Sequence, residues 1–129
     1  MARILIAEDE AVIALDLEGL LLQAGHEVVE TATSAAEVYE AVRREDPDVV
    51  LLDIGLGRDD GVAVAEQLRR SWSGAVIFVT GNADPATQRR ATLAGPEAIV
   101  YKPFVSTQVR EAVDRAARAV KGRRAGSLD

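Results

Sequence analysis

Short runs of apolar residues recur along the chain and alternate with more polar stretches. Each run is rich in Val, Ile, Leu or Ala and is bounded by polar residues or glycine, which is typical of strands covered on both faces. We expect strands at 3–7, around Val28 and Val29, at 48–53, at 75–80 and at 98–101.

Between these runs, apolar residues recur at the spacing of three and four that predicts helices. We expect helices at 13–24, 34–45, 61–70, 84–94 and 109–120. Two of them have start signals, because Ser34 has capping-box spacing to Glu37 and Asp84 precedes a proline. The 84–94 helix has few large apolar residues, so we expect it to be the least tightly packed.

Strands that alternate with helices predict an α/β fold with a five-stranded parallel sheet and helices on both faces. We expect the doubly wound strand order 2-1-3-4-5, in which the first, third, fourth and fifth strands are neighbours. With 129 residues, the chain has the length of one domain. We assign residues 1–121 to that domain and 122–129 to a flexible C-terminal tail.

The composition narrows the classes of function. A net charge of −6 argues against nucleic-acid binding by this chain. The absence of cysteine excludes disulfides and thiolate metal sites. No apolar run is long enough for a membrane span or a signal peptide, so we expect a cytoplasmic protein without membrane contact.

The residues that follow the strands are those with reactive side chains. Glu8 and Asp9 follow the first strand, Asp53 the third, Thr80 ends the fourth, and Lys102 follows the fifth. The carboxyl ends of parallel strands share one edge, where such folds bind ligands. A charge cannot stay inside a sheet without a partner, so we expect Asp53 to emerge at this edge.

Three carboxylates close together repel one another unless a hard cation lies among them. The Lys102 ammonium can pair with Asp53 or with an anion that arrives there. A phosphoryl group on Asp53 would therefore meet a cation, an ammonium and the Thr80 hydroxyl together. This combination predicts phosphoryl transfer to a carboxylate.

The ordered motifs resemble the receiver domain of two-component response regulators, the CheY-like family. They are Ile4-Leu-Ile-Ala-Glu-Asp-Glu10, Val50-Leu-Leu-Asp-Ile54 with Gly61 eight residues after Asp53, Ile77-Phe-Val-Thr-Gly81, and Ala94-Gly95 followed by Lys102-Pro-Phe104. The resemblance covers residues 3–120. The first helix and two departures described below are similar to the atypical single-domain receivers of alphaproteobacterial stress signalling.

The resemblance implies that Asp53 accepts a phosphoryl group from a histidine kinase or phosphotransfer protein. Asp9, Asp53 and the backbone carbonyl of Gly55 would hold Mg²⁺ or Mn²⁺, with Glu8 reaching the ion through water. Thr80 and Lys102 would contact the phosphoryl group. The Lys102–Pro103 peptide would be cis.

The sequence departs from the family pattern at two places. Gly57 stands where a proline is usual, so we expect a more mobile loop. Ile99 stands at the aromatic switch position, and Tyr101 lies beside Lys102. In the family, an aromatic side chain at this position swings when the threonine moves. Because Ile99 is stiff at χ1, we expect no such swing, and we expect Thr80 to move the backbone of 81–82 and the 84–94 helix.

We expect that helix, the fifth strand and the last helix to contact a downstream protein, and the chain to be a monomer or weak dimer. With no effector domain after the last helix, the output would go to another protein, or the chain would act as a phosphate sink. Two alternatives stay open. One is a phosphorylation-independent binding module. The other is an Asp-nucleophile phosphohydrolase. Such an enzyme would need a second acidic residue as general acid two residues after Asp53, and Gly55 occupies that position.

Overall fold

A five-stranded parallel sheet forms the centre of the protein. The computed structural model describes the backbone of residues 1–126 and the side chains of residues 1–124. The strands are β1 (Arg3–Ala7), β2 (Glu27–Ala32), β3 (Val49–Leu52), β6 (Ala75–Thr80) and β7 (Ala98–Tyr101). Their order is β2-β1-β3-β6-β7, and every neighbouring pair is parallel. The doubly wound α/β fold predicted from the sequence is therefore confirmed.

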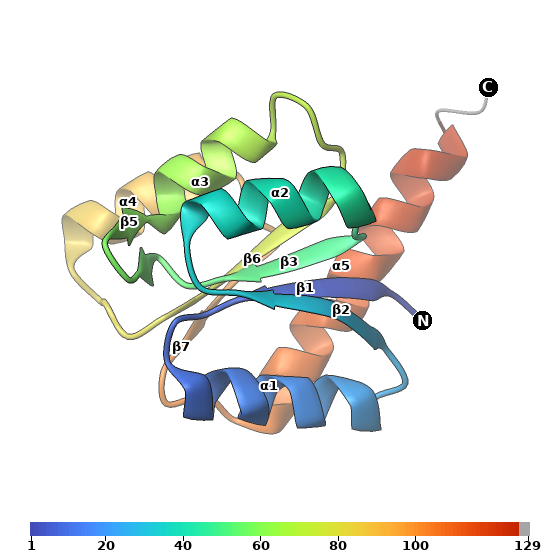
Figure 1. The fold of residues 1–129 in the computed structure, drawn as a ribbon, viewed down its shortest axis with the longest axis horizontal. Coiled ribbons are helices and arrows are strands. Elements are labelled where there is room, and N and C mark those ends of the chain that lie inside the picture. The colour runs from blue at the N-terminus through green and yellow to red at the C-terminus, as the bar shows by residue number, and fades with distance from the viewer. Residues whose placement is uncertain (127–129) are drawn as a thin grey trace.

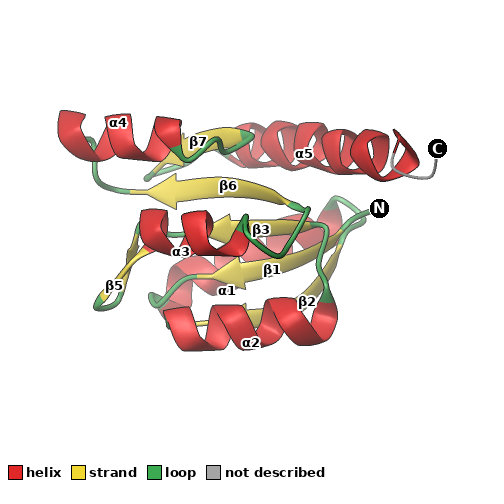
Figure 2. Cartoon of the chain, turned by 90° about the horizontal axis from the view of Figure 1, so that it is seen from above, coloured by secondary structure: helices red, strands yellow, loops and turns green. Residues whose placement is uncertain are grey.

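Helices cover both faces of the sheet (Figures 1 and 2). They are α1 (Ala11–Gln23), α2 (Ala35–Glu45), α3 (Gly61–Leu68), α4 (Pro85–Leu93) and α5 (Ser106–Gly126). In Figure 1, α2 and α3 lie on one face, with α4 beside α3, and α1 and α5 lie on the other. The predicted helices are all present, and the last one is longer than expected.

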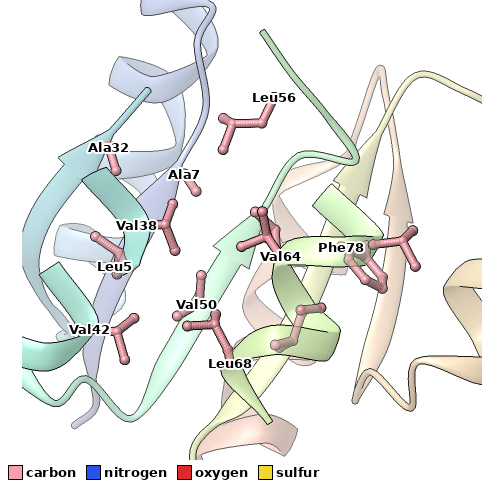
Figure 3. Packing of buried hydrophobic residues seen from close by; sticks show 14 of the residues in the cluster. Leu5, Ala7, Ala32, Val38, Val42, Val50, Leu56, Val64, Leu68 and Phe78 are labelled. Atoms are coloured by element: carbon pink, nitrogen blue, oxygen red, sulfur yellow. The ribbon is translucent and has the colours of Figure 1, made fainter. Parts of the chain in front are cut away.

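Alternate residues of each strand enter two separate cores, because successive side chains of a strand point to opposite faces. On the side of α2, α3 and α4, the core contains Leu5, Val50 and Phe78 (Figure 3). Leu52 belongs to the same core. On the side of α1 and α5, it contains Ile4, Ile6, Val49, Leu51 and Ile77. The sheet is thus fixed from both sides, which places its carboxyl edge rigidly.

Helix α4 is the exception to this tight packing. Ala91 is its only buried residue, whereas α3 buries five of its eight residues. The expectation that the 84–94 helix packs least tightly is confirmed. Within residues 1–126, no helix combines the length and the apolar character needed to cross a membrane.

The loop after β3 forms a short hairpin that was not predicted. Strands β4 (Gly55–Leu56) and β5 (Asp59–Asp60) pair antiparallel. Gly57, which turns the chain between them, has φ +59°, a conformation that favours glycine. Leu56 is fully buried in the α2–α3 core, and this anchor gives order to a segment that we expected to be a loop.

The expected tail is helical through Gly126, so the assignment of 122–129 as a flexible segment needs correction over 122–126. Ion pairs explain the extension, since Arg123 contacts Glu97 at 2.9 Å and Arg124 contacts Asp48 at 2.6 Å. These partners lie far away in the sequence, so local patterns do not reveal them. Residues 127–129 lie outside the described residues.

Gly61 lets helix α3 start directly against the end of β3. A Cβ there would lie 2.3 Å from Asp53 O and 2.7 Å from Ile54 Cα. Both contacts are with backbone that cannot rotate away. We therefore expect Gly61→Ala to lower the free energy of unfolding by about 1–3 kcal/mol through overpacking, measured by urea unfolding followed by the fluorescence of Trp72, the single tryptophan.

Gly19→Ala is the matched control. Gly19 lies inside α1, and a Cβ there would meet nothing within 4 Å. Because alanine restricts the unfolded chain and favours helix, this variant should gain about 0.5–1 kcal/mol. Equal effects of the two substitutions would contradict the steric role of Gly61.

Candidate functional site

Asp53 lies at the carboxyl end of β3, where its backbone N–H donates to Ala7 O at 3.0 Å. Its Oδ1 accepts a hydrogen bond from the Gly55 N–H at 3.0 Å, and its Oδ2 accepts one from Lys102 Nζ at 2.9 Å. The residue is only 6% exposed. Asp53 is therefore at the expected edge but does not emerge into solvent, because Lys102 compensates its charge.

Lys102 joins two of the acidic residues from the end of β7. Its Nζ lies 2.9 Å from Asp53 Oδ2 and 2.8 Å from Glu8 Oε1. Burial lowers the pKa of Lys102, but the two carboxylates outweigh it and raise the pKa above its usual value. The backbone N–H of Lys102 donates to Thr80 O at 2.8 Å, and the Lys102–Pro103 peptide is cis.

Glu8, Asp9 and Asp53 form a cluster in which one carboxylate oxygen of each lies within 4.8 Å of the others. Asp9 is exposed, whereas Glu8 is 2% exposed. Apart from the Lys102 ion pair, Glu8 Oε1 has no hydrogen-bond partner among the described residues. Burial raises the pKa of Glu8 to about 7; the Lys102 hydrogen bond opposes this rise, and Asp53 adds to it.

These observations fit a hard divalent cation. The donors are oxygens, they converge, and one of them is a buried carboxylate held at a cost in its charged form. The single nearby ammonium, Lys102, faces two carboxylates. A cation held by Asp9 and Asp53, with Glu8 at longer range, would balance the excess negative charge of the carboxylates.

Thr80 and Lys102 line one cavity together with Asp53 and Gly55; its volume is about 440 Å³. Thr80 is 2% exposed, and its Oγ1 accepts a hydrogen bond from the Asn82 N–H at 3.0 Å. The hydroxyl thus contacts the loop that leads to α4. The structure brings together the Asp53 carboxylate, the Thr80 hydroxyl and the Lys102 ammonium, which the sequence placed on separate strands.

Ile99 and Tyr101 lie away from this cavity, on β7. Ile99 packs against the α2–α3 core, whereas Tyr101 is 41% exposed. Tyr101 is the strand partner of Thr80. A partly buried Ile99 has packing contacts that a rotation would break, which agrees with its stiffness at χ1.

A charged pair that was not predicted from the sequence lies at the rim of the cavity. Asp60 and Arg90 both line it, and the Arg90 guanidinium donates to Asp60 Oδ2. Burial raises the pKa of Asp60, but hydrogen bonds from Arg90 and from the Val62 N–H outweigh it and lower the pKa. Asp60 could have been recognised as the N-cap of α3; nothing in the sequence points to Arg90 as its partner.

The raised pKa of Glu8 makes the stability of the metal-free protein depend on pH. Protonated Glu8 is favoured in the folded state, so its contribution is complete below the ordinary pKa of 4.5 and is lost as the pH rises through about 7. We expect Glu8→Gln, which mimics the neutral form, to be more stable than the parent at about pH 8 by up to about 3 kcal/mol. Urea unfolding in the presence of EDTA measures this difference.

The gain should shrink as the pH falls toward the ordinary pKa of Glu8, because the parent carboxyl then becomes protonated as well. Glu66→Gln, on the exposed face of α3, is the control and should show no such pH-dependent gain. A Glu8→Gln protein that is less stable than the parent at the higher pH would contradict the assignment.

Solved structures of receiver domains share this fold, and two of them are covered almost completely by this chain. The signal receiver domain of a modulated diguanylate cyclase from Desulfovibrio desulfuricans G20 superposes with a TM-score of 0.88 at 27% identity, covering 95% of this chain and 98% of that one. A CheY-like receiver domain protein from Methanospirillum hungatei JF-1 gives a TM-score of 0.86 at 26% identity, covering 95% and 98%.

Among sequence relatives, the chemotaxis protein CheY of Thermotoga maritima is 28% identical over 117 residues, which is 90% of this chain and 98% of that protein. The transcriptional regulatory protein PdtaR of Mycobacterium tuberculosis is 32% identical over 114 residues, 88% of this chain. The chain spans only 56% of the length of PdtaR. The family model of the response regulator receiver domain matches residues 4–114, and the chain therefore belongs to the family of response regulator receiver domains.

Proposed function

We propose that Asp53 accepts a phosphoryl group from a histidine kinase or phosphotransfer protein, and that the resulting change of shape is read by a protein partner. Receiver domains are signalling domains rather than enzymes, so the self-catalysed steps would be limited to acceptance and loss of the phosphoryl group. The observation that carries the proposal is the contact of Lys102 Nζ with both Asp53 and Glu8, at 2.9 and 2.8 Å.

The chemistry follows from this geometry. An Asp53 oxygen attacks the phosphorus of a phosphohistidine, the P–N bond breaks, and the imidazole leaves with the bonding electrons. Asp53 then carries roughly −1.5 to −2 charge in place of −1. Lys102 is already within hydrogen-bond distance of Asp53, and Thr80 lines the same cavity. Lys102 can contact the new oxygens from its present position, and Thr80 would close on them from the lining of the same cavity.

A divalent cation, Mg²⁺ or Mn²⁺, would be held by Asp9, Asp53 and the carbonyl of Gly55, with Glu8 at longer range. When bound, it would reduce the repulsion between the incoming phosphoryl group and the acids. Without it, Lys102 is the nearest cation to three clustered carboxylates. The protein groups themselves orient the acceptor, through the Gly55 N–H and Lys102.

A surface for the phosphoryl donor lies on α1. Val12, Leu15 and Leu22 are 76%, 68% and 54% exposed, and large apolar side chains that are exposed on one helix favour a protein contact. Helix α1 begins at Ala11, directly after the acid cluster. A partner docked along it would reach the edge of the sheet where Asp53 lies.

The output surface would consist of α4, β7 and α5. Leu93 on α4 is 85% exposed and Tyr101 on β7 is 41% exposed. Because α4 buries only Ala91, it can shift at a lower cost than the other helices. The downstream partner would then recognise α4 in its shifted position. Where the kinase is shared with other proteins, phosphoryl acceptance by Asp53 without a downstream partner would make the chain a phosphate sink.

The first test is phosphorylation by acetyl phosphate with Mg²⁺, read by intact mass. The parent should take up one base-labile phosphoryl group, and Asp53→Asn none, because the amide retains the shape but is not a nucleophile. Asp16→Asn, on the exposed side of α1, is the control and should react like the parent.

Excess EDTA should abolish the uptake, and transfer that is unchanged in EDTA would contradict a metal requirement. An Asp53→Asn protein that still gains the group would refute the acceptor. Steady release of phosphate over many turnovers would favour the phosphohydrolase, and no adduct on the parent would favour a binding module.

The second test concerns the route of the signal. We expect beryllofluoride, which stands in for the phosphoryl group, to shift the backbone NMR signals of 81–82 and of α4 more than those of α1 and α2. The reason is that Thr80 Oγ1 contacts the Asn82 N–H and α4 is loosely packed. A stationary α4 with large shifts in α1 and α2 would refute this route.

A further inference from the structure

We propose that Arg90 transmits the state of Asp53 to helix α4 by exchanging one partner for another. In the unphosphorylated protein the guanidinium pairs with Asp60, and in the phosphorylated protein it pairs with the phosphoryl group. This proposal rests on the proposed function, since it supposes that Asp53 becomes phosphorylated. It assigns to Arg90 a positioning role for which neither composition nor periodicity supplied a signal.

Arg90 lies at the right place for this exchange. It extends from the last turn of α4 to the rim of the cavity of about 440 Å³ that is also lined by Asp53, Thr80 and Lys102. Among the described residues that line this cavity, Arg90 and Lys102 carry the positive charges. An anion in the cavity therefore has two candidate cations.

These two cations differ in how firmly they are held. The Lys102 side chain is 15% exposed and contacts two nearly inaccessible carboxylates, those of Glu8 and Asp53. The Arg90 side chain is 50% exposed, and its partner Asp60 is 43% exposed. Water and salt screen an exposed pair and make it weak. Arg90 is thus the cation whose partner can be replaced.

Asp60 can release Arg90 without losing its structural role. Its Oδ1 accepts a hydrogen bond from the Val62 N–H at 3.0 Å and caps α3, while Oδ2 contacts Arg90. The preceding residue, Asp59, accepts a hydrogen bond from the Ala35 N–H at 2.7 Å, at the start of α2. The β4–β5 hairpin is therefore fixed to α2 and α3 by contacts that do not involve Arg90.

Helix α4, in contrast, depends on such charged contacts. Its one buried residue is Ala91, and a second tie to α3 runs from the Arg69 guanidinium to Gly95 O at 2.9 Å, just beyond the helix. A change at Arg90 would leave this second tie in place. The end of α4 would then act as a pivot while Arg90 turns toward Asp53.

The added charge on Asp53 supplies the driving force. A phosphoryl group offers three acceptor oxygens, and guanidinium groups bind such oxygens in a bidentate manner. In the structure Arg90 contacts one carboxylate oxygen of Asp60, while the other accepts the Val62 N–H. The phosphoryl group is thus the stronger partner. Arg90 would also stabilise it and slow its loss.

Beryllofluoride with Mg²⁺ is the probe, and its affinity and the α4 amide shifts are the readouts. Arg90→Gln should bind it about five- to tenfold more weakly than the parent, with smaller shifts over residues 86–93. Asp60→Asn retains an N-cap side chain but frees Arg90, so it should bind about two- to fivefold more tightly.

Arg89→Gln is the matched control, because it removes the same charge from the adjacent position of α4, and Arg89 does not line the cavity. It should bind like the parent. Equal affinity and equal α4 shifts for Arg90→Gln and Arg89→Gln would overturn the role of Arg90, as would weaker binding by Asp60→Asn. A parent protein that fails to bind beryllofluoride would overturn the proposed function and this inference together.

Discussion

The buried ion pair between Lys102 and Asp53 is the interaction on which the site depends. A carboxylate that is 6% exposed is stable only with a partner, because a buried and unpaired charge is costly. The partner directly follows β7, which is separated from β3 by β6 in the sheet. The parallel register that aligns the ends of these strands is therefore also what neutralises Asp53. Glu8 shares the same ammonium at 2.8 Å, so the site has more negative than positive charge, and this imbalance favours a bound cation.

The segment that follows Asp53 connects this pair to the helices. Gly61 allows α3 to start in contact with the backbone of Asp53 and Ile54. The two residues before it face different neighbours, since Asp59 contacts the start of α2 and Asp60 contacts α4. The β4–β5 hairpin thus connects Asp53 with three helices, α2, α3 and α4. Helices α2 and α3 bury several residues in the apolar core, whereas α4 buries only Ala91 and also relies on the exposed pair of Arg90 and Asp60.

This unequal packing gives the fold a preferred direction of response. The two cores fix the sheet, α1, α2, α3 and α5, so a perturbation at the carboxyl edge has few places where it can move the backbone cheaply. Ile99 is packed against the core, so a rotation of its side chain would break these contacts. This packing agrees with the proposed route through the 81–82 loop and α4, because Thr80 bonds to that loop and Arg90 of α4 lines the cavity.

The fold and the positions of Asp53, Glu8, Asp9, Thr80 and Lys102 could be derived from the sequence, because they follow local rules. Apolar runs such as Val49–Leu52 mark strands, and in parallel sheets the residue after each strand lies at one common edge. Features formed by residues distant in the chain could not be derived. The Arg90–Asp60 pair, the burial of Asp53 beneath Lys102, the hairpin anchored by Leu56 and the extension of α5 by Arg123 and Arg124 all require contacts between separate elements. Exposed charges have no periodicity that identifies their partners, so only the tertiary arrangement decided which of these residues meet.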